Sequence, residues 1–217
     1  MMSIAMDEQS ASELGLPIRS PLKAVCSGDL EPLFWRPQRL GKSSGWWGHV
    51  PFAFWLVANA RPRVIVELGT ENGISYSAFC EAVVQARCET RCYAIDLWKG
   101  DEHAGFYGEN VYLDLAAFHQ HRYGRFSELI RSTFDDALKY FEDGKVDLLH
   151  IDGLHTYEAV KHDFEAWQPK LSSRAIVLFH DVYTCFPEMR LFWALIARRF
   201  RSYLIPYSHG LGIIQFR

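Results

Sequence analysis

The chain has 217 residues, 49% of them hydrophobic and 15% aromatic, and this composition excludes a disordered or low-complexity protein. Its length suits one domain with a single hydrophobic core. The 23 basic and 26 acidic residues give a formal net charge of −3, and no long basic run occurs. We therefore expect no nucleic-acid partner and no attachment to an anionic membrane, and a small molecule is the favoured partner.

The cysteines and the first residues indicate a reducing compartment. Cysteines occur at Cys26, Cys80, Cys88, Cys92 and Cys185, an odd count without a C-x-x-C pair. Such a set is poorly suited to a disulfide scaffold or to a four-thiolate zinc site. The segment MMSIAMDEQS has acidic side chains and no unbroken apolar run, so we expect neither a signal peptide nor a membrane span. The sequence thus predicts a cytoplasmic protein.

Proline and glycine, which break helices, crowd the first 45 positions. We expect residues 1–45 to form an irregular arm and residues 46–217 to form a single domain. The apolar stretch Trp46–Ala60 has the length of a helix and is predicted to pack against a sheet, with Trp47 and His49 as weak candidates for a pocket wall. The same stretch could contact a second copy of the chain, so the sequence leaves a homo-oligomer open.

From residue 62 onward, short apolar runs alternate with helix-like segments. The expected strands cover residues 64–68, 92–97, 126–131, 146–151, 175–179, 203–207 and 211–216, and the expected helices cover residues 74–86, 110–121, 135–141, 156–167 and 187–200. This alternation predicts a doubly wound α/β fold, with helices on both faces of a mostly parallel, seven-stranded sheet. A tight turn at residues 208–210 joins the last two strands and makes one strand antiparallel near the edge. Ligands of such sheets bind beyond the carboxyl ends of the strands.

The first strand end carries the sequence VIVELGTENGIS. Gly69 permits a tight turn after the strand, and Gly73 permits close approach to the start of the next helix, where backbone N–H groups can hold a carboxylate or phosphate. Asp96 ends the second strand 23 residues after Gly73, close to the offset of about 20 residues at which an acid binds a ribose diol. A nucleoside ligand is therefore expected. The missing third glycine argues against an NAD-dependent dehydrogenase.

His and Asp side chains follow two further strands, in the sequences HIDGLHTYE and LFHD. Because consecutive strands of this fold are expected to be neighbours, Asp152, His155, His180 and Asp181 should lie side by side. This set can bind one divalent cation: oxygen ligands favour Mg²⁺ or Ca²⁺, and imidazole favours Mn²⁺, Fe²⁺ or Zn²⁺. The two aspartates could alternatively only cap the following helices. His150, inside the apolar strand, is predicted to be a packing residue.

The motifs VELGTENGIS, YAIDLW, HIDGLHTYEAV and VLFHD together resemble class I S-adenosylmethionine-dependent methyltransferases. The resemblance covers residues 46–216 and is strongest to the branch that methylates sugar or antibiotic hydroxyls and is associated with polysaccharide biosynthesis. It implies a Rossmann-like fold, S-adenosyl-L-methionine as cofactor, and a set of cofactor-binding residues: Glu67, Gly69, Thr70, Gly73, Ser75, Asp96 and Asp152. It also implies Asp152, His180 and Asp181 as ligands of Mg²⁺ or Mn²⁺, although members of that branch often have two consecutive acids where this chain has His180 and Asp181.

The expected reaction transfers a methyl group to a hydroxyl of a sugar or glycan-like small molecule. A cation on Asp152 and Asp181 would lower the pKa of that hydroxyl, and a neighbouring imidazole would accept its proton. His155 is the first choice for this base because it lies three residues after Asp152, and His180 is the second choice. The Gly-rich segment 98–108 is either a mobile lid over the acceptor, with Asp101 and His103 near it, or a plain surface loop.

Two other functions are compatible with the same residues. A metal-dependent hydrolase or hydroxylase would use the His and Asp cluster without the methyl donor, and a non-catalytic nucleotide-binding module would keep the cleft without turnover. A nucleic-acid methyltransferase is disfavoured, because the chain has no basic stripe and no Asn-Pro-Pro-Tyr or Pro-Cys motif at the fourth strand end.

Overall fold

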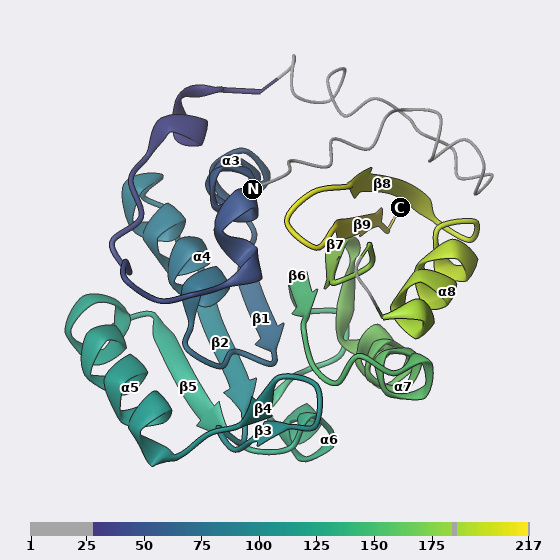
Figure 1. The fold of residues 1–217 in the computed structure, drawn as a ribbon. Coiled ribbons are helices and arrows are strands. Elements are labelled where there is room, and N and C mark those ends of the chain that lie inside the picture. The colour runs from purple at the N-terminus through teal and green to yellow at the C-terminus, as the bar shows by residue number, and fades with distance from the viewer. Residues whose placement is uncertain (1–27, 184–185, 217) are drawn as a thin grey trace, which may run out of the picture.

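The computed structural model describes residues 28–183 and 186–216 (Figure 1). Residues 1–27 of the expected irregular arm lie outside this part, as do Cys26 and Cys185. The described end of the arm contains one short 3-10 helix, η1 (Glu31–Phe34), and a second one, η2 (Gly45–His49), leads into the domain. Cys80, Cys88 and Cys92 are free thiols.

Seven strands form one sheet in the order β5-β2-β1-β6-β7-β9-β8. The strands are β1 (Val64–Leu68), β2 (Arg91–Asp96), β5 (Ser127–Arg131), β6 (Val146–Ile151), β7 (Leu171–His180), β8 (Arg201–Ile205) and β9 (Leu211–Gln215). Strand β9 is antiparallel to both β7 and β8, whereas the other adjacent pairs are parallel. The predicted fold class, a mostly parallel seven-stranded sheet with one antiparallel strand, is confirmed.

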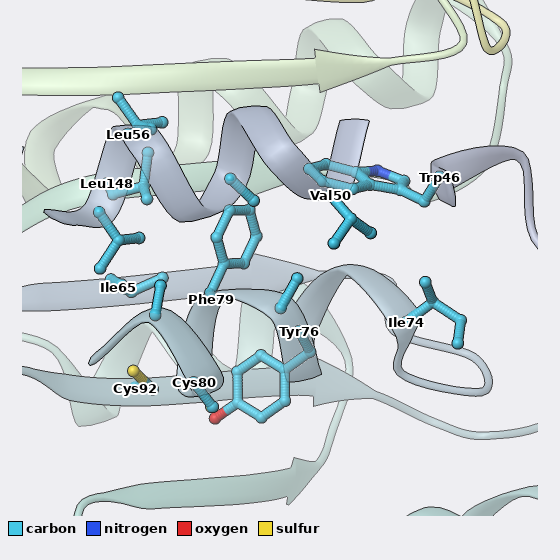
Figure 2. Close-up of a cluster of buried hydrophobic side chains, with 14 of the residues drawn as sticks. Trp46, Val50, Leu56, Ile65, Ile74, Tyr76, Phe79, Cys80, Cys92 and Leu148 are labelled. Atoms are coloured by element: carbon cyan, nitrogen blue, oxygen red, sulfur yellow. The ribbon is translucent and has the colours of Figure 1, made fainter. Parts of the chain in front are cut away.

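Helices cover both faces of this sheet (Figure 1). The first face carries α3 (Val50–Ala60), α4 (Ile74–Gln85) and α5 (Glu109–Tyr123), and the second carries α6 (Phe134–Ala137), α7 (Tyr157–Trp167) and α8 (Pro187–Ile196). Because successive strand residues point to opposite faces, Ile65 of β1 belongs to the first hydrophobic cluster and Val66 to the second. Figure 2 shows the first cluster, in which Trp46 lies at the end near Ile74.

Several element boundaries differ from the expected ones, including the end of α8 at Ile196 instead of residue 200 and the shift of β8 to Arg201–Ile205. Helix α3 begins at Val50, because Gly45–His49 forms the 3-10 turn η2 instead of helix. Strand β7 begins at Leu171, since its pairing with β6 continues past a register shift between Val146 and Leu148. Segment 98–108 contains a small hairpin of β3 (Gly100–Asp101) and β4 (Gly105–Phe106). None of the helices in the described part is long and apolar enough to span a membrane.

Candidate functional site

The carboxyl ends of β1, β2, β6 and β7 open into one cavity of about 530 Å³. Its wall contains most of the residues singled out in the sequence, namely Gly69, Thr70, Ser75, Asp96, Asp101, His103, Asp152, His155, His180 and Asp181. Gly73 and Glu67 are not among the residues that line the cavity. The lining also includes residues that the sequence did not single out as ligands, among them Ser44, Gly45 and His209.

The turn after β1 is held by backbone geometry that only glycine adopts easily. Gly69 has φ +83°, and a Cβ there would collide with the carbonyl oxygen of Asp152. Gly73 has φ +75°, and a Cβ there would meet the side chain of Leu115. The two glycines therefore let the β1–α4 turn approach the β6 end on one side and α5 on the other.

Asp96 binds the glycine turn directly. Its Oδ2 accepts N–H bonds from Thr70 and Glu71 at 2.8 and 2.9 Å, and its Oδ1 accepts the N–H of Trp98 at 2.7 Å. Asp96 thus occupies two backbone amides of the turn that precedes α4. A carboxylate accepts about four hydrogen bonds, so Oδ1 retains room for a ligand donor such as a ribose hydroxyl.

A buried hydrogen-bonded chain lies behind the cavity. The Nε1–H of Trp46 donates to Nε2 of His150 at 3.2 Å, and Nδ1 of His150 lies 2.7 Å from Oε2 of Glu67. The side chains of Glu67 and His150 are both fully buried. Burial raises the pKa of Glu67, and the hydrogen bond from His150 opposes this shift. His150 is a core residue, as predicted, but it also connects Trp46 to Glu67.

Asp152 and Asp181 form a compact cluster with two histidines. Asp181 Oδ2 lies 2.9 Å from His155 Nε2 and 3.0 Å from His180 Nδ1. Asp152 Oδ1 lies 3.2 Å from His180 Nδ1 and 3.7 Å from His155 Nε2. Each carboxylate therefore contacts both imidazoles, and the charges alternate around the cluster. The predicted convergence of these four residues is present in the structure.

The cluster shifts the pKa values of its members. Burial lowers the pKa of His155 and His180, but the two carboxylates outweigh burial and raise these values to about 9 and about 10. Burial raises the pKa of Asp181, and the neighbouring imidazoles of His155 and His180 outweigh this effect and lower it to about 2. Both imidazoles thus hold a second proton near neutral pH when no other cation is present.

The turn between β8 and β9 completes the cluster on its outer side. Nδ1 of His209 lies 3.2 Å from Asp181 Oδ1, and the His209 side chain is 59% exposed. The carbonyl of Ser208 lies 2.9 Å from His49 Nε2 and 3.3 Å from His180 Nε2. Ser208, His209 and Gly210 all have positive φ angles, so this turn is strained at two non-glycine residues. The sequence indicated a tight turn here, and no motif marked His209 as part of the site.

Family comparison identifies the kind of site. Residues 66–182 match the model of a family described as a methyltransferase domain. The chain belongs to this family of methyltransferase domains. The uncharacterized protein y4gI of Sinorhizobium fredii (strain NBRC 101917 / NGR234) is 50% identical over 186 residues, which cover 82% of this chain and 20% of that protein. The chain therefore spans about a fifth of the length of this curated relative.

Solved structures share the fold at low sequence identity. The SAH-bound methyltransferase PaMTH1 of Podospora anserina has a TM-score of 0.62 and 18% identity, with 100% of both chains covered. The O-methyltransferase TomG of Streptomyces achromogenes, involved in tomaymycin synthesis and solved with SAM, has a TM-score of 0.58 and 14% identity, with 98% of this chain and 100% of TomG covered. At these identities the likeness shows the fold of the methyltransferase domain.

The methyltransferase domain carries donor atoms suited to a divalent cation. One ligand atom each from Asp152, His155 and Asp181 lies within 4.8 Å of the others. Two carboxylates with an imidazole suit Mn²⁺, Fe²⁺ or Zn²⁺ better than Mg²⁺ or Ca²⁺. A metal bound here must displace the second proton of each imidazole that coordinates it. The donor set thus fits a metal, with His155 as a ligand candidate beside the expected His180.

Aromatic rings flank this cluster at the cavity wall. The ring of Phe186 stacks on His155 with centroids 4.7 Å apart and an interplanar angle of 10°. His103, from the segment between β3 and β4, stacks on Phe186 at 5.1 Å. Asp101 shapes that segment, because its Oδ1 accepts the N–H groups of His103 and Ala104 at 2.7 Å each. The β3–β4 hairpin therefore borders the cavity, as the lid interpretation of segment 98–108 requires.

Proposed function

We propose that the domain is an S-adenosylmethionine-dependent O-methyltransferase acting on a hydroxyl of a sugar or glycan-like small molecule. The observation that carries this proposal is the single cavity in which the glycine turn, Asp96 and the His and Asp cluster meet. Membership of a methyltransferase-domain family gives this cavity its chemistry. The SAM and SAH bound in TomG and PaMTH1, which share the fold, support the choice of cofactor.

The cofactor half of the cavity lies between β1 and β2. Asp96 retains acceptor capacity at Oδ1 for the ribose diol. The hydroxyl of Thr70 is buried and has no hydrogen-bond partner among the described residues, so it is available to a ligand in the cavity that Thr70 lines. Gly69 allows the turn to pack closely against the end of β6, where a side chain at this position would collide with the carbonyl oxygen of Asp152. These groups would bind the nucleoside and the methionine end of the donor.

The acceptor half lies beyond β6 and β7. Flat rings at His155, His103 and Phe186 stand beside carboxylates, a combination that suits a sugar ring with its apolar face and hydroxyl edge. A cation on Asp152, His155 and Asp181 would, when bound, polarise the acceptor hydroxyl. Holding the hydroxyl in line with the methyl donor is the main contribution expected of the protein, worth roughly 7–11 kcal/mol where geometry is near-ideal.

The acceptor hydroxyl must also lose its proton. We assign the proton-accepting role to His209, which lines the cavity and whose Nδ1 lies 3.2 Å from Asp181 Oδ1, with His155 and His180 as the alternatives that the sequence suggests. The carboxylate of Asp181 orients Nδ1 of His209. Nε2 of His209 has no hydrogen-bond partner within the described residues. An imidazole oriented by a carboxylate and exposed to the cavity is the usual arrangement of a general base.

Calorimetric titration with S-adenosylmethionine tests the proposal. We expect micromolar binding by the wild-type protein and at least tenfold weaker binding by Asp96→Ala, because this variant loses the ribose acceptor. Asp101→Ala is the matched control: it removes another cavity carboxylate, whose hydrogen bonds within the described part of the chain go to its own hairpin, and should bind as wild type. Absence of binding by the wild-type protein would contradict the proposal and favour the metal-dependent hydrolase.

A further inference from the structure

We infer that Trp46 is a positioning residue of the cofactor site, acting through His150 on the buried carboxylate of Glu67. This inference rests on the proposed function. It extends the site to η2, which lies outside the residues 66–182 matched to the family. Trp46 is itself part of the cavity wall, so one side chain connects the ligand space with the buried chain behind it.

The hydrogen bonds assign the proton on His150. An indole N–H can only donate, so Nε2 of His150, which receives it at 3.2 Å, carries a lone pair. The proton of the neutral ring must then be on Nδ1, which lies 2.7 Å from Oε2 of Glu67 and donates to it. Trp46 therefore selects the one neutral tautomer of His150 that can hold the Glu67 carboxylate.

Glu67 needs this donor because its side chain is fully buried. With the other tautomer, the Nδ1 lone pair would face a carboxylate oxygen, and a buried carboxylate without a donor is costly. Glu67 precedes Gly69 by two residues, at the end of β1 next to the turn proposed to bind the cofactor. S-adenosylmethionine carries positive charges on its sulfonium and its amino group. A fixed negative charge next to this turn would attract them.

Trp46 is held firmly enough to perform this role. The hydroxyl of Ser44 accepts the N–H of Trp46 at 3.0 Å and caps η2. The indole meets Phe79 edge-on at 5.5 Å and His150 edge-on at 5.0 Å. Its side chain is 2% exposed. The packing fixes the ring plane, and the ring plane aims the N–H at His150.

Nitrogen-15 NMR of histidine-labelled protein measures the tautomer directly, without any ligand. The signal of His150 is assigned by its loss in His150→Gln. We expect the Nδ1–H form in the wild-type protein and a mixture of tautomers in Trp46→Phe, which keeps an aromatic ring but lacks the N–H. Trp47→Phe is the matched control, since the indole of Trp47 donates to the Lys42 carbonyl instead. An Nε2–H form in the wild-type protein would overturn the inference.

Titration with S-adenosylmethionine measures the consequence. Trp46→Phe should raise the dissociation constant by about 3- to 10-fold, the range expected for one net hydrogen bond, and Trp47→Phe by less than about twofold. In a Glu67→Gln background the Trp46→Phe change should have little further effect, because no carboxylate remains for His150 to hold. A purely structural role of Trp46 would instead weaken binding equally in both backgrounds, and that result would overturn the inference.

The outcomes separate this inference from the proposed function. No binding by the wild-type protein overturns both. Wild-type binding that Trp46→Phe leaves unchanged overturns the inference alone. If Trp46→Phe does not fold, the wild-type tautomer and the affinity of Glu67→Gln still decide: an Nδ1–H tautomer with weakened binding supports the inference, and unchanged binding by Glu67→Gln overturns it.

Discussion

Asp181 divides its two carboxylate oxygens among three imidazole rings. Oδ2 contacts His155 and His180, and Oδ1 contacts His209. Its backbone has φ 60°, a left-handed conformation that aspartate tolerates better than most residues. This conformation follows directly after β7. A single residue therefore connects the β6–α7 loop, the β7 end and the β8–β9 turn.

His209 is expected to be essential for turnover and dispensable for cofactor binding. Once an acceptor is known, His209→Ala should lower kcat by about 10²- to 10⁴-fold, the range typical of a lost general base, with the S-adenosylmethionine affinity unchanged. Steady-state kinetics and calorimetry measure the two quantities. His121→Ala, an exposed histidine of α5, is the control. If His209→Ala retains full kcat while His155→Ala abolishes it, the base is His155, as the sequence alone suggested.

The identity of the cavity residues was largely predictable from the sequence, but their partners were not. Carboxyl ends of parallel strands meet at one edge, so Asp96, Asp152 and Asp181 could be grouped in advance. Trp46 and His150, in contrast, are 104 residues apart and meet only because η2 packs against the sheet. His209 belongs to the site because the β8–β9 turn folds over Asp181, and no local pattern encodes that contact.

At the scale of elements, the amino ends of the strands are joined by one buried carboxylate. Asp147 of β6 accepts the backbone N–H of Arg63, which precedes β1, at 2.8 Å. It also accepts the hydroxyl of Ser172 at 2.6 Å and a guanidinium N–H of Arg174 at 2.9 Å, both on β7. Burial would raise the pKa of Asp147, but Arg174, Ser172 and Arg63 outweigh it and lower the pKa well below its usual value.

Asp147→Asn should destabilise the domain by roughly 1.5–3 kcal/mol at pH 7, the range for hydrogen bonds to a charged group. Because the folded-state pKa is lowered, this contribution is present above the unfolded pKa of about 4 and is lost as the pH falls below it. Urea unfolding at pH 7 and pH 3 measures the change. Asp143→Asn removes an exposed pair with Lys170 and should cost little. A wild-type advantage that persisted undiminished at pH 3 would contradict this account.

Periodicity located every strand of the large sheet, because buried strands and amphipathic helices repeat their apolar residues differently. It misplaced boundaries where long-range pairing or turn geometry decides. The extension of β7 to Leu171 depends on pairing with β6. The two tryptophans of the 3-10 turn Gly45–His49 continue the apolar run of the helix after it, so the pattern does not separate the two elements. The two-residue strands at Gly100 and Gly105 are too short to leave any periodic signal.

At the scale of the whole molecule, a second buried acid, Asp163, makes stability depend on pH in the opposite direction to Asp147, because its pKa is raised and that of Asp147 is lowered. Asp163 of α7 is 7% exposed, and no hydrogen bond to its carboxylate is found within the described residues. Burial raises its pKa to about 7, and the proximity of His162 only partly counters this. Since the folded form binds this proton more tightly than the unfolded chain, stability is lost as the pH rises from about 4 to about 7.

Asp163→Asn should therefore raise the unfolding free energy at pH 8, by up to a few kcal/mol at about 1.4 kcal/mol per pKa unit. At pH 4 the unfolding free energies of the variant and the wild-type protein should be similar. Asp163 is then protonated in the folded protein and in about half of the unfolded chains, so folding changes its protonation little. Thermal and urea unfolding across this pH range test the expectation. Glu158→Gln, an exposed acid of the same helix, is the control. Equal gains at both pH values would rule out titration of Asp163 as the cause.

The contact between η2 and the β8–β9 turn has a consequence for biosynthesis. The N–H of Gly48 donates to the hydroxyl of Ser208 at 3.1 Å, and a Cβ on Gly45 would collide with the ring of His209. Strand β9 inserts between β7 and β8, although it follows both in the chain. During synthesis, residues 45–49 leave the ribosome about 160 residues before the β8–β9 turn that they contact. The nascent domain consequently has a nearly complete sheet before it has a complete cavity, and activity should appear only after β9 has left the exit tunnel.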